Sequence, residues 1–255
     1  MIITTKHWKD MDNDQRNSVC EYQQLSIAFI SKHWKDMDNY QRYRVCEYQQ
    51  LSIAFISKHW KDMDNYQRNS VCEYQQLSIA FISKHWKDMN NYQRYRVCID
   101  QQLSIAFISK HWKDMDNDQR NRVCKYQPSI PKTIKLDSYQ QKLRNSLKQP
   151  SKKERINRAK TYAKKYNLTI KNNYLYAYRD HNNGRGIYKQ NSNYKKGKTY
   201  KDWHCDPRQN VSNSYGFGIW PKGNTKVKVP LDKFVVDVSN INDGKARVFE
   251  FTILK

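Results

Sequence analysis

The feature that most constrains the fold is an internal repeat of 26 residues in the first half of the chain. The hexapeptide Lys-His-Trp-Lys-Asp-Met begins five times, at Lys6, Lys32, Lys58, Lys84 and Lys110. A Val-Cys pair follows each copy at a constant distance and ends at Cys20, Cys46, Cys72, Cys98 and Cys124. Self-similarity at a fixed period of this length is typical of small units that stack, because one such unit cannot bury its apolar face alone.

Each unit has the pattern of two short helices. Segment 26–37 carries an amphipathic stripe at spacings of three, four and three, formed by Ile27, Ile30, Trp34 and Met37. Ser26 is placed to cap this helix, and Asp38 with Asn39 can cap the next one. The second helix carries residues at spacings of three, Tyr40, Tyr43 and Cys46. We therefore expect residues 1–127 to form an α solenoid of helical hairpins, with about three turns in each helix.

Composition supports helices throughout this half. All six prolines lie at or beyond Pro128 and all seven glycines at or beyond Gly184, so residues 1–127 lack the residues that mark loops and sheet turns. One long coiled coil is the competing interpretation. Because 26 is not a multiple of seven, a coiled-coil seam would lose register at every copy. We therefore favour the solenoid.

The copies differ at the pair of residues before Val-Cys. Asn-Ser stands at 17–18 and 69–70, Tyr-Arg at 43–44 and 95–96, and Asn-Arg at 121–122, as if a 52-residue pair of units had been duplicated. Tyrosine and arginine are enriched among the residues that dominate binding energy at protein interfaces. Our candidate protein-interaction surface is therefore Tyr43, Arg44, Tyr95 and Arg96. Ordinary solvated surface is the alternative.

Histidine and cysteine recur in every unit and are metal-ligand types. A zinc site needs about four ligands at about 2.0–2.3 Å, whereas each unit offers one His and one Cys. Equivalent residues of stacked helices lie about 8–10 Å apart, which also exceeds the Cα separation of about 7 Å that a disulfide allows. We therefore predict no metal site, free thiols, a core role for Trp34 and Cys46, and a hydrogen-bonded polar edge for His33.

The repeat breaks at Gln127-Pro128, and residues 128–150 have the composition of a linker with one short helix. Ser151 and Glu154 then form the sequence signature of a capping box that opens a basic helix. From Leu168 onward, turn signals separate short β-type runs, the clearest being Tyr174–Arg179, Tyr215–Trp220, Lys226–Val238 interrupted at Pro230, and Ala246–Leu254. We expect residues 151–255 to form a small α+β domain, with one helix against an antiparallel sheet.

Positive charge is concentrated in the second half. Residues 1–124 hold 18 Lys and Arg against 15 Asp and Glu, whereas the rest of the chain holds 29 against 9. Such a field attracts anionic partners. Three tyrosines alternate along one predicted strand and would share a face, as in a base-stacking platform. The candidate nucleic-acid surface combines them with residues of the basic helix: Lys152, Arg155, Lys164, Lys165, Tyr174, Tyr176 and Tyr178. Half-buried tyrosines on an ordinary sheet are the alternative.

One segment has residue types that could support catalysis. Asp202, His204, Cys205 and Asp206 surround Trp203, and His181 follows Asp180, so a cysteine nucleophile with a histidine base can be drawn. Adjacent residues of a strand point to opposite faces, which places His204 and Cys205 poorly for one site. Segment 184–186 lacks the remaining elements of a phosphate-binding loop. We expect no enzyme, no catalytic or metal site, and no cofactor.

The motif Tyr-Gln-Gln-Leu-Ser-x-x-Phe-Ile-x-Lys-His-Trp resembles the short helical repeats of uncharacterised proteins in giant DNA viruses of the mimivirus kind and in bacteriophages. The second half resembles a domain of the same viruses through four segments, Leu175-Tyr176-Ala177-Tyr178-Arg179, Gly197-Lys198-Thr199-Tyr200, Trp203-His204-Cys205 and Asp243-Gly244-Lys245-Ala246-Arg247-Val248. The resemblance covers most of the chain except the linker. This unit departs from the usual pattern in having Ile-Ala after Ser instead of acidic residues, which removes favourable charge at the helix start. The resemblance implies a viral protein and brings no established activity.

The leading hypothesis is a non-enzymatic viral scaffold that binds a protein partner through the solenoid. Its rival is a nucleic-acid-associated protein that works through residues 151–255. The first residues lack the features of a signal peptide, and no stretch approaches the roughly 18 apolar residues that span a bilayer. We therefore expect a protein of the host-cell cytoplasm, or of the virus particle, without membrane insertion.

Overall fold

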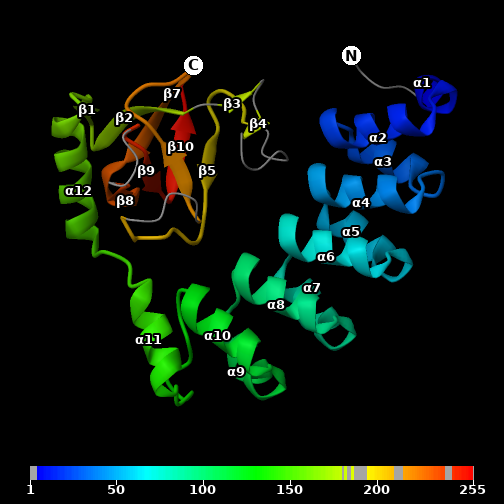
Figure 1. The fold of residues 1–255 in the computed structure, drawn as a ribbon, viewed down its shortest axis with the longest axis horizontal. Coiled ribbons are helices and arrows are strands. Elements are labelled where there is room, and N and C mark those ends of the chain that lie inside the picture. The colour runs from blue at the N-terminus through cyan, green and yellow to red at the C-terminus, as the bar shows by residue number, and fades with distance from the viewer. Residues whose placement is uncertain are drawn as a thin grey trace. The chain divides into compact units, whose positions relative to one another are not determined.

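The structure, a computed structural model, describes residues 5–179, 181–182, 185–186, 194–209, 215–238 and 243–254. It divides the chain into two compact units (Figure 1). The first comprises Met1–Val123 with Ser129–Ile134, and the second comprises Cys124–Pro128 with Lys135–Lys255.

A solenoid of helical hairpins follows α1 (Thr5–Asp10), as the repeat predicts. The first helices of the hairpins are α3 (Ile27–His33), α5 (Ile53–His59), α7 (Ile79–His85) and α9 (Ile105–His111). The second helices are α2 (Asn13–Tyr22), α4 (Asn39–Tyr48), α6 (Asn65–Tyr74), α8 (Asn91–Asp100) and α10 (Asn117–Tyr126). Successive second helices from α2 to α8 pack against one another in one row (Figure 1). The breaks between these short helices rule out one continuous coiled coil.

The first helix of each hairpin is shorter than the expected three turns. α5 has seven residues, and the 3-10 turn η1 (Trp60–Asp62) follows it. Arg68 donates from Nε to the Trp60 carbonyl oxygen at 3.0 Å and from Nη2 to the Lys61 carbonyl oxygen at 3.2 Å. Because the guanidinium occupies carbonyls that a longer helix would bond internally, the chain can turn here. The turn recurs as η2 (Trp86–Asp88) and η3 (Trp112–Asp114).

Side-chain caps mark the helix starts. Ser52 Oγ accepts a hydrogen bond from the Phe55 amide at 3.2 Å, as expected for the serine of the repeat. Asp64 and Gln67 form a reciprocal capping box at the start of α6. Such caps contribute about 0.5–2 kcal/mol each. They matter here because helices of seven to ten residues are marginal in isolation.

Aromatic rings join each repeat unit to the next. The Trp34 indole meets the Phe55 ring edge-on at a centroid distance of 5.1 Å and lies 5.5 Å from the His59 ring. Trp34 is buried, which confirms the predicted core role. The predicted hydrogen bond of the histidine is present, since His33 Nδ1 lies 3.2 Å from Asp36 Oδ2, but the side chain is buried and is not at an edge of the core. The equivalent residue of the next repeat unit, His59, is 6% exposed. Its ring packs against Phe55 at 4.6 Å, so the flat face of the imidazole serves as part of the core.

Buried glutamines join the units through the backbone. Gln75 Nε2 donates to the carbonyl oxygens of Cys46 at 2.7 Å and Gln49 at 2.8 Å, and Gln75 Oε1 accepts from the Leu51 amide at 2.9 Å. Gln49 and Gln101 make the same three bonds one unit to either side. Each glutamine therefore satisfies carbonyls at the end of the preceding second helix, which have no partner within that helix.

The second unit is an α+β fold with helices α11 (Ser138–Ser146) and α12 (Lys152–Lys165). Its largest sheet is antiparallel, in the order β1 (Ile170–Lys171), β2 (Tyr174–Arg179), β7 (Thr225–Pro230), β10 (Glu250–Ile253), β5 (Thr199–Lys201). A second sheet has the order β6 (Phe217–Ile219), β9 (Ala246–Val248), β8 (Phe234–Asp237). β3 (His181–Asn182) pairs with β4 (Arg185–Gly186).

The expected strand Lys226–Val238 is divided between two sheets. β7 ends at Pro230, and the 3-10 turn η4 (Leu231–Lys233) leads into β8. Proline fixes its own backbone and has no amide hydrogen to continue the ladder, so the strand stops there.

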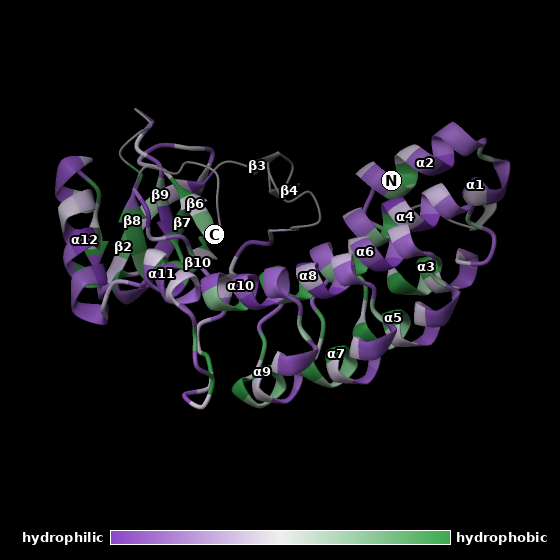
Figure 2. Ribbon diagram, turned by 60° about the horizontal axis from the view of Figure 1, so that its bottom comes forward, coloured by the Kyte–Doolittle hydropathy of each residue, from purple (hydrophilic) through white to green (hydrophobic). Residues whose placement is uncertain are grey.

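One face of the five-stranded sheet is packed in the core, and α12 lies on that side. Leu175 and Ala177 of β2 are buried in the same cluster as Ala159 and Tyr162 of α12. Figure 2 shows that most residues of α12 are hydrophilic. The strand against which α12 packs, β8, is hydrophobic. The capping box of Ser151 and Glu154 is present as predicted. The other face of the sheet carries the half-buried residues of β2.

Candidate functional site

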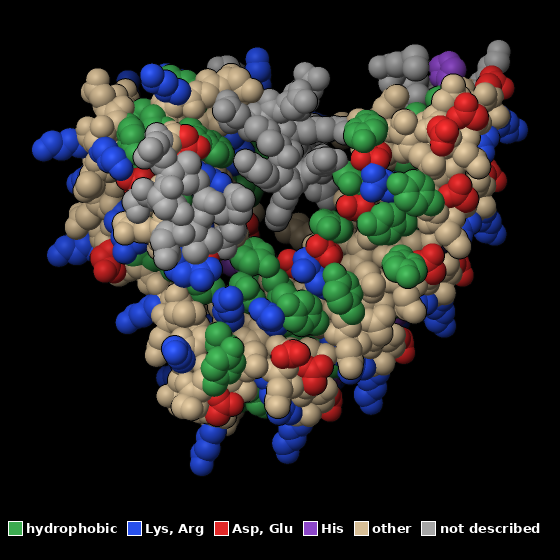
Figure 3. All heavy atoms as spheres, in the orientation of Figure 1, with side chains coloured by type: hydrophobic (Ala, Val, Ile, Leu, Met, Phe, Trp, Pro, Cys, Tyr) green, Lys and Arg blue, Asp and Glu red, His purple; other side chains and the backbone are tan. Residues whose placement is uncertain are grey.

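Tyrosines line the row of second helices in the first unit. Five of them are between 44% and 73% exposed, and we refer to these as the tyrosine surface: Tyr22, Tyr40, Tyr66, Tyr74 and Tyr92. Tyr40, Tyr66 and Tyr92 occupy one repeat position on α4, α6 and α8, so about 8–10 Å separates each from the next. In Figure 3, green side chains alternate with blue and red ones along this row. The surface is aromatic and mixed in charge.

Arg44 is held among the tyrosines of α4. Its guanidinium carbon lies 5.5 Å from the centre of the Tyr40 ring and 4.5 Å from that of Tyr48. It forms ion pairs with Glu47 at 3.3 Å and with Glu21 of the preceding unit. The side chain is 15% exposed, so this predicted interface residue is also a bridge between two units.

Arg96 forms the same kind of bridge between the third and fourth repeats. Its Nη2 lies 2.7 Å from Glu73 of the preceding unit and 3.0 Å from Asp100. At the equivalent position of the third unit, Ser70 is buried. The 52-residue alternation therefore corresponds to two arginine bridges. Arg44 joins the second repeat to the first, and Arg96 joins the fourth repeat to the third.

Tyr43 and Tyr95, the remaining predicted interface residues, lie beside the tyrosine surface. Both are half-buried. The Tyr43 ring is 6.3 Å from that of Tyr40, and the Tyr95 ring is 6.4 Å from that of Tyr92. The structure thus brings all four predicted residues onto second helices, next to rings that are more exposed than they are.

Lysines and tyrosines interleave on the outer face of the five-stranded sheet. The register places Tyr176 opposite Lys228 and Tyr178 opposite Lys226, and opposite residues of antiparallel strands share a face. Lys228 Nζ lies 4.8 Å from the centre of the Tyr174 ring, and Lys226 Nζ lies 5.9 Å from that of Tyr176. We refer to these five residues as the outer sheet face. It combines aromatic rings with ammonium groups, which suits an anionic ligand that can stack.

The predicted basic residues of α12 are not on this face, because the helix packs against β8 and η4 and shares a core cluster with the buried residues of β2. Lys152 and Lys164 are exposed. Arg155 donates to the carbonyl oxygens of Asp232 and Pro150, and Lys165 pairs with Asp237 at 2.8 Å. The structure therefore does not bring the seven residues of the predicted nucleic-acid surface together.

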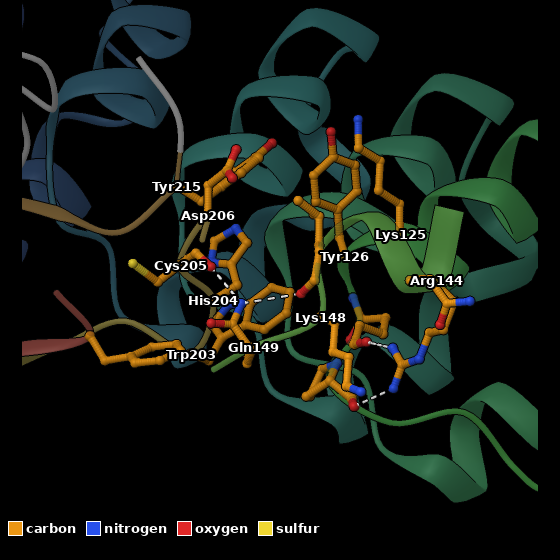
Figure 4. Close-up of a pocket in the computed structure, with 15 residues that line it drawn as sticks. Lys125, Tyr126, Arg144, Lys148, Gln149, Trp203, His204, Cys205, Asp206 and Tyr215 are labelled. Atoms are coloured by element: carbon orange, nitrogen blue, oxygen red, sulfur yellow. Dashed lines mark hydrogen bonds between the residues drawn. The ribbon is translucent and has the colours of Figure 1, made fainter. Parts of the chain in front are cut away.

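The segment around Trp203 borders a pocket of about 370 Å³ within the second unit (Figure 4). His204 Nδ1 lies 2.7 Å from Asp202 Oδ1, and the His204 ring stacks on Trp203 with centroids 4.0 Å apart and planes at 6°. The centroid of the Tyr215 ring lies 4.0 Å from that of the imidazole, and Tyr126 meets Tyr215 edge-on at 5.2 Å. The pocket thus has aromatic walls, and His204, which Asp202 contacts from outside the lining, is one of them.

Cys205 follows His204 in the chain and also borders the pocket, but its side chain is buried. Its side chain is 2% exposed and packs in a cluster with Val235, Val236 and Val238. Burial raises the pKa of the Cys205 thiol well above its ordinary value, so the neutral thiol is the stable form. A buried neutral thiol is a weaker nucleophile than an exposed thiolate. Asp180 lies outside the described residues, as does the side chain of His181.

The five repeat cysteines are buried and free. Burial raises the pKa of Cys124 to about 11 and that of Cys20 to about 12. Among the residues that the structure describes, no group of three or more His, Cys, Asp or Glu side chains is arranged to hold a metal ion.

No protein-family model, curated protein or solved structure matches the chain. Within the described residues, no helix has the length and apolar character needed to cross a membrane.

Two groups of residues in these surfaces are absent from the sequence-based prediction. The outer sheet face includes Lys226 and Lys228, which alternate with the buried Val227 and Val229. This two-residue period is visible in the sequence and could have indicated them. The exposed rings at Tyr66 and its equivalents were also missed, although their position just after the helix cap is where a side chain commonly faces solvent.

Proposed function

We propose that the chain is a scaffold whose solenoid binds a protein partner through the tyrosine surface. The observation that carries this proposal is the set of five tyrosines, 44% to 73% exposed, on adjacent second helices. Tyrosine offers a large amphipathic contact area and loses little conformational entropy when it is fixed. Exposed aromatic side chains in a continuous row are therefore suited to an interface.

The charges around these tyrosines favour a protein over a nucleic acid. Residues 1–124 are nearly balanced, with 18 basic and 15 acidic side chains. Arg44 and Arg96 are engaged with carboxylates of the same and the preceding unit. Paired charges give weak attraction for a polyanion, but they fix the neighbouring rings in place, which lowers the entropic cost of binding.

Site-directed cross-linking tests this proposal in the full chain. A photoreactive phenylalanine analogue at Tyr66, which is 73% exposed, should give discrete protein adducts in the native cellular setting. Tyr139 on α11 is 59% exposed and lies outside the tyrosine surface, so the same analogue there is the matched control. Identical adducts from both positions would show that exposure alone, rather than this surface, determines contact.

A second candidate function is supported by a separate observation, the lysines placed over tyrosine rings on the outer sheet face. This face would bind single-stranded nucleic acid, with bases stacking on the rings and phosphates near Lys226 and Lys228. The large excess of basic residues beyond residue 124 would add long-range attraction.

Matched charge reversals separate this second function from general electrostatic attraction. The full chain carrying Lys226→Glu and Lys228→Glu should bind a fluorescent single-stranded oligonucleotide much more weakly than the wild type. Lys152→Glu with Lys164→Glu changes the net charge by the same amount on α12 and should weaken binding less. Equal losses in the two double variants would remove the outer sheet face as a specific site.

A further inference from the structure

We infer that the pocket beside Trp203 is a binding site for a mononucleotide. It goes beyond both interaction surfaces, since it is a cavity within the second unit and shares no residue with the outer sheet face. Its lining combines three features: aromatic rings in contact, cationic side chains, and a buried ring nitrogen that has no hydrogen-bond partner among the described residues.

The aromatic walls suit a flat heterocycle. Trp203 and His204 are stacked, the Tyr215 ring contacts His204 at a tilt of 39°, and Tyr126 stands edge-on to Tyr215. Figure 4 shows these residues, from separate segments of the chain, around the same cavity. Pockets of about 300–1,000 Å³ hold small ligands and cofactors, and a volume of about 370 Å³ is within that range.

The unpartnered nitrogen belongs to His204. The Asp202 carboxylate can only accept, so His204 Nδ1 carries the hydrogen of their 2.7 Å contact. In the neutral ring, Nε2 is then an acceptor. It is buried and has no hydrogen-bond partner among the described residues. A ligand that donates an N–H, such as a base amide or exocyclic amine, would satisfy it.

Positive groups favour an anionic portion of the ligand. Lys125, Arg144 and Lys148 line the pocket, whereas the lining carboxylate, Asp206, is bound by Arg208 Nη2 at 2.6 Å. Arg144 also donates to the carbonyl oxygens of Gln127 and Pro128, so it is held in place. A heterocycle with a donor and a phosphate fits this lining better than a neutral aromatic molecule or a free anion does.

Calorimetric titration of the full chain tests the inference. The probes are AMP, CMP, GMP and UMP, with inorganic phosphate and the four free nucleosides as comparisons. At least one nucleotide should bind, more tightly than its nucleoside and than phosphate. His204→Phe keeps the ring stack but removes the acceptor, and Lys148→Glu removes a cation at an exposed position. Each variant should lower the affinity for that nucleotide about tenfold or more, which corresponds to the loss of one good polar contact.

The control is Lys142→Glu, an equal charge change at an exposed position of α11 that does not line the pocket, and it should leave the affinity unchanged. Circular dichroism of each variant shows whether it folds. The inference is overturned if none of the four nucleotides binds at about 1 mM, where even weak complexes are detectable. It is also overturned if phosphate binds as well as the nucleotides, or if the folded Lys148→Glu variant binds like the wild type.

Discussion

The side-chain amide of Gln75 donates to the carbonyl oxygen of Cys46 at 2.7 Å, across the boundary between two repeat units. Equivalent glutamines, Gln49 and Gln101, make this bond to the preceding unit. The end of one second helix is therefore completed by a residue at the end of the next. Stability in such an array resides as much in the interfaces between units as in the units themselves.

Replacing this glutamine should destabilise the solenoid strongly. Gln75→Leu leaves two carbonyl oxygens and the Leu51 amide without their partner in a buried place. We expect the free energy of unfolding to fall by about 3 kcal/mol or more, because three buried groups lose their partner and each costs about 1–3 kcal/mol. Urea unfolding measures the change. Gln76→Leu, at the adjacent exposed position, is the control and should change stability by less than about 0.5 kcal/mol.

Trp60 should be among the most sensitive core positions. Its indole is 1% exposed and contacts Phe81 of the next unit at 5.2 Å. Trp60→Ala should lower the free energy of unfolding, measured by urea unfolding, by about 3–5 kcal/mol through lost burial and the cavity left behind.

A reducing agent should leave the melting temperature of the wild type unchanged, since all six cysteines are free thiols. A clear drop on reduction would contradict the free thiols.

Much of the solenoid could be predicted because its determinants are local. The cap at Ser52 and the capping box of Asp64 with Gln67 are each contained within four residues. His59 shows the limit of this approach. Its burial depends on Trp34, one unit earlier, and no propensity of histidine itself indicates such a contact.

The second compact unit, the α+β fold, was harder to predict because its contacts also join residues far apart in the sequence. The alternation of tyrosines on β2 indicated that they share a face, and they do. Lys228 reaches Tyr174 only through the pairing of β2 with β7, two strands that are far apart in the sequence. The packing of α12 against β8 likewise depends on residues far apart in the sequence. Pro230 was visible as an interruption, but the assignment of the following strand to another sheet was not.

Acidification should destabilise the solenoid through its buried histidines. Burial lowers the pKa of His59, His85 and His111 below the ordinary value of 6.5. Between that value and the lowered pKa, the unfolded chain binds more protons than the folded one. The free energy of unfolding is therefore highest above pH 6.5 and falls as the pH drops below it.

Urea unfolding at intervals from about pH 7.5 to about pH 5 measures this dependence, in a range where most carboxylates stay ionised. The triple variant His59→Gln, His85→Gln, His111→Gln loses ring packing and should be less stable at every pH. Its stability should nevertheless vary less with pH over this range. A wild-type stability that rises on acidification would contradict the assigned direction.

On the outer sheet face, stacking and charge should be separable by salt. Tyr176→Ala should weaken binding of single-stranded nucleic acid by about 1–3 kcal/mol and leave the salt dependence unchanged. Lys228→Gln should instead reduce the slope of log affinity against log salt by about 0.7, the value for one phosphate contact. The measurement is anisotropy of a labelled oligonucleotide across a salt series. A changed slope with Tyr176→Ala would contradict a stacking role for Tyr176. An unchanged slope with Lys228→Gln would contradict a phosphate contact of Lys228.

The central claim, that the tyrosine surface binds a protein, is tested most directly by quantitative co-purification of the full chain from its native cellular setting. The informative variant carries Tyr40→Ser, Tyr66→Ser and Tyr92→Ser, and Tyr139→Ser is the control for an exposed tyrosine elsewhere. Because single tyrosines at interface centres contribute about 1–2 kcal/mol or more, the triple variant should lose a defined set of proteins by at least about tenfold. The Tyr139→Ser protein should retain that set at wild-type levels. Recovery of the same proteins in equal amounts with all three forms of the chain would contradict the claim.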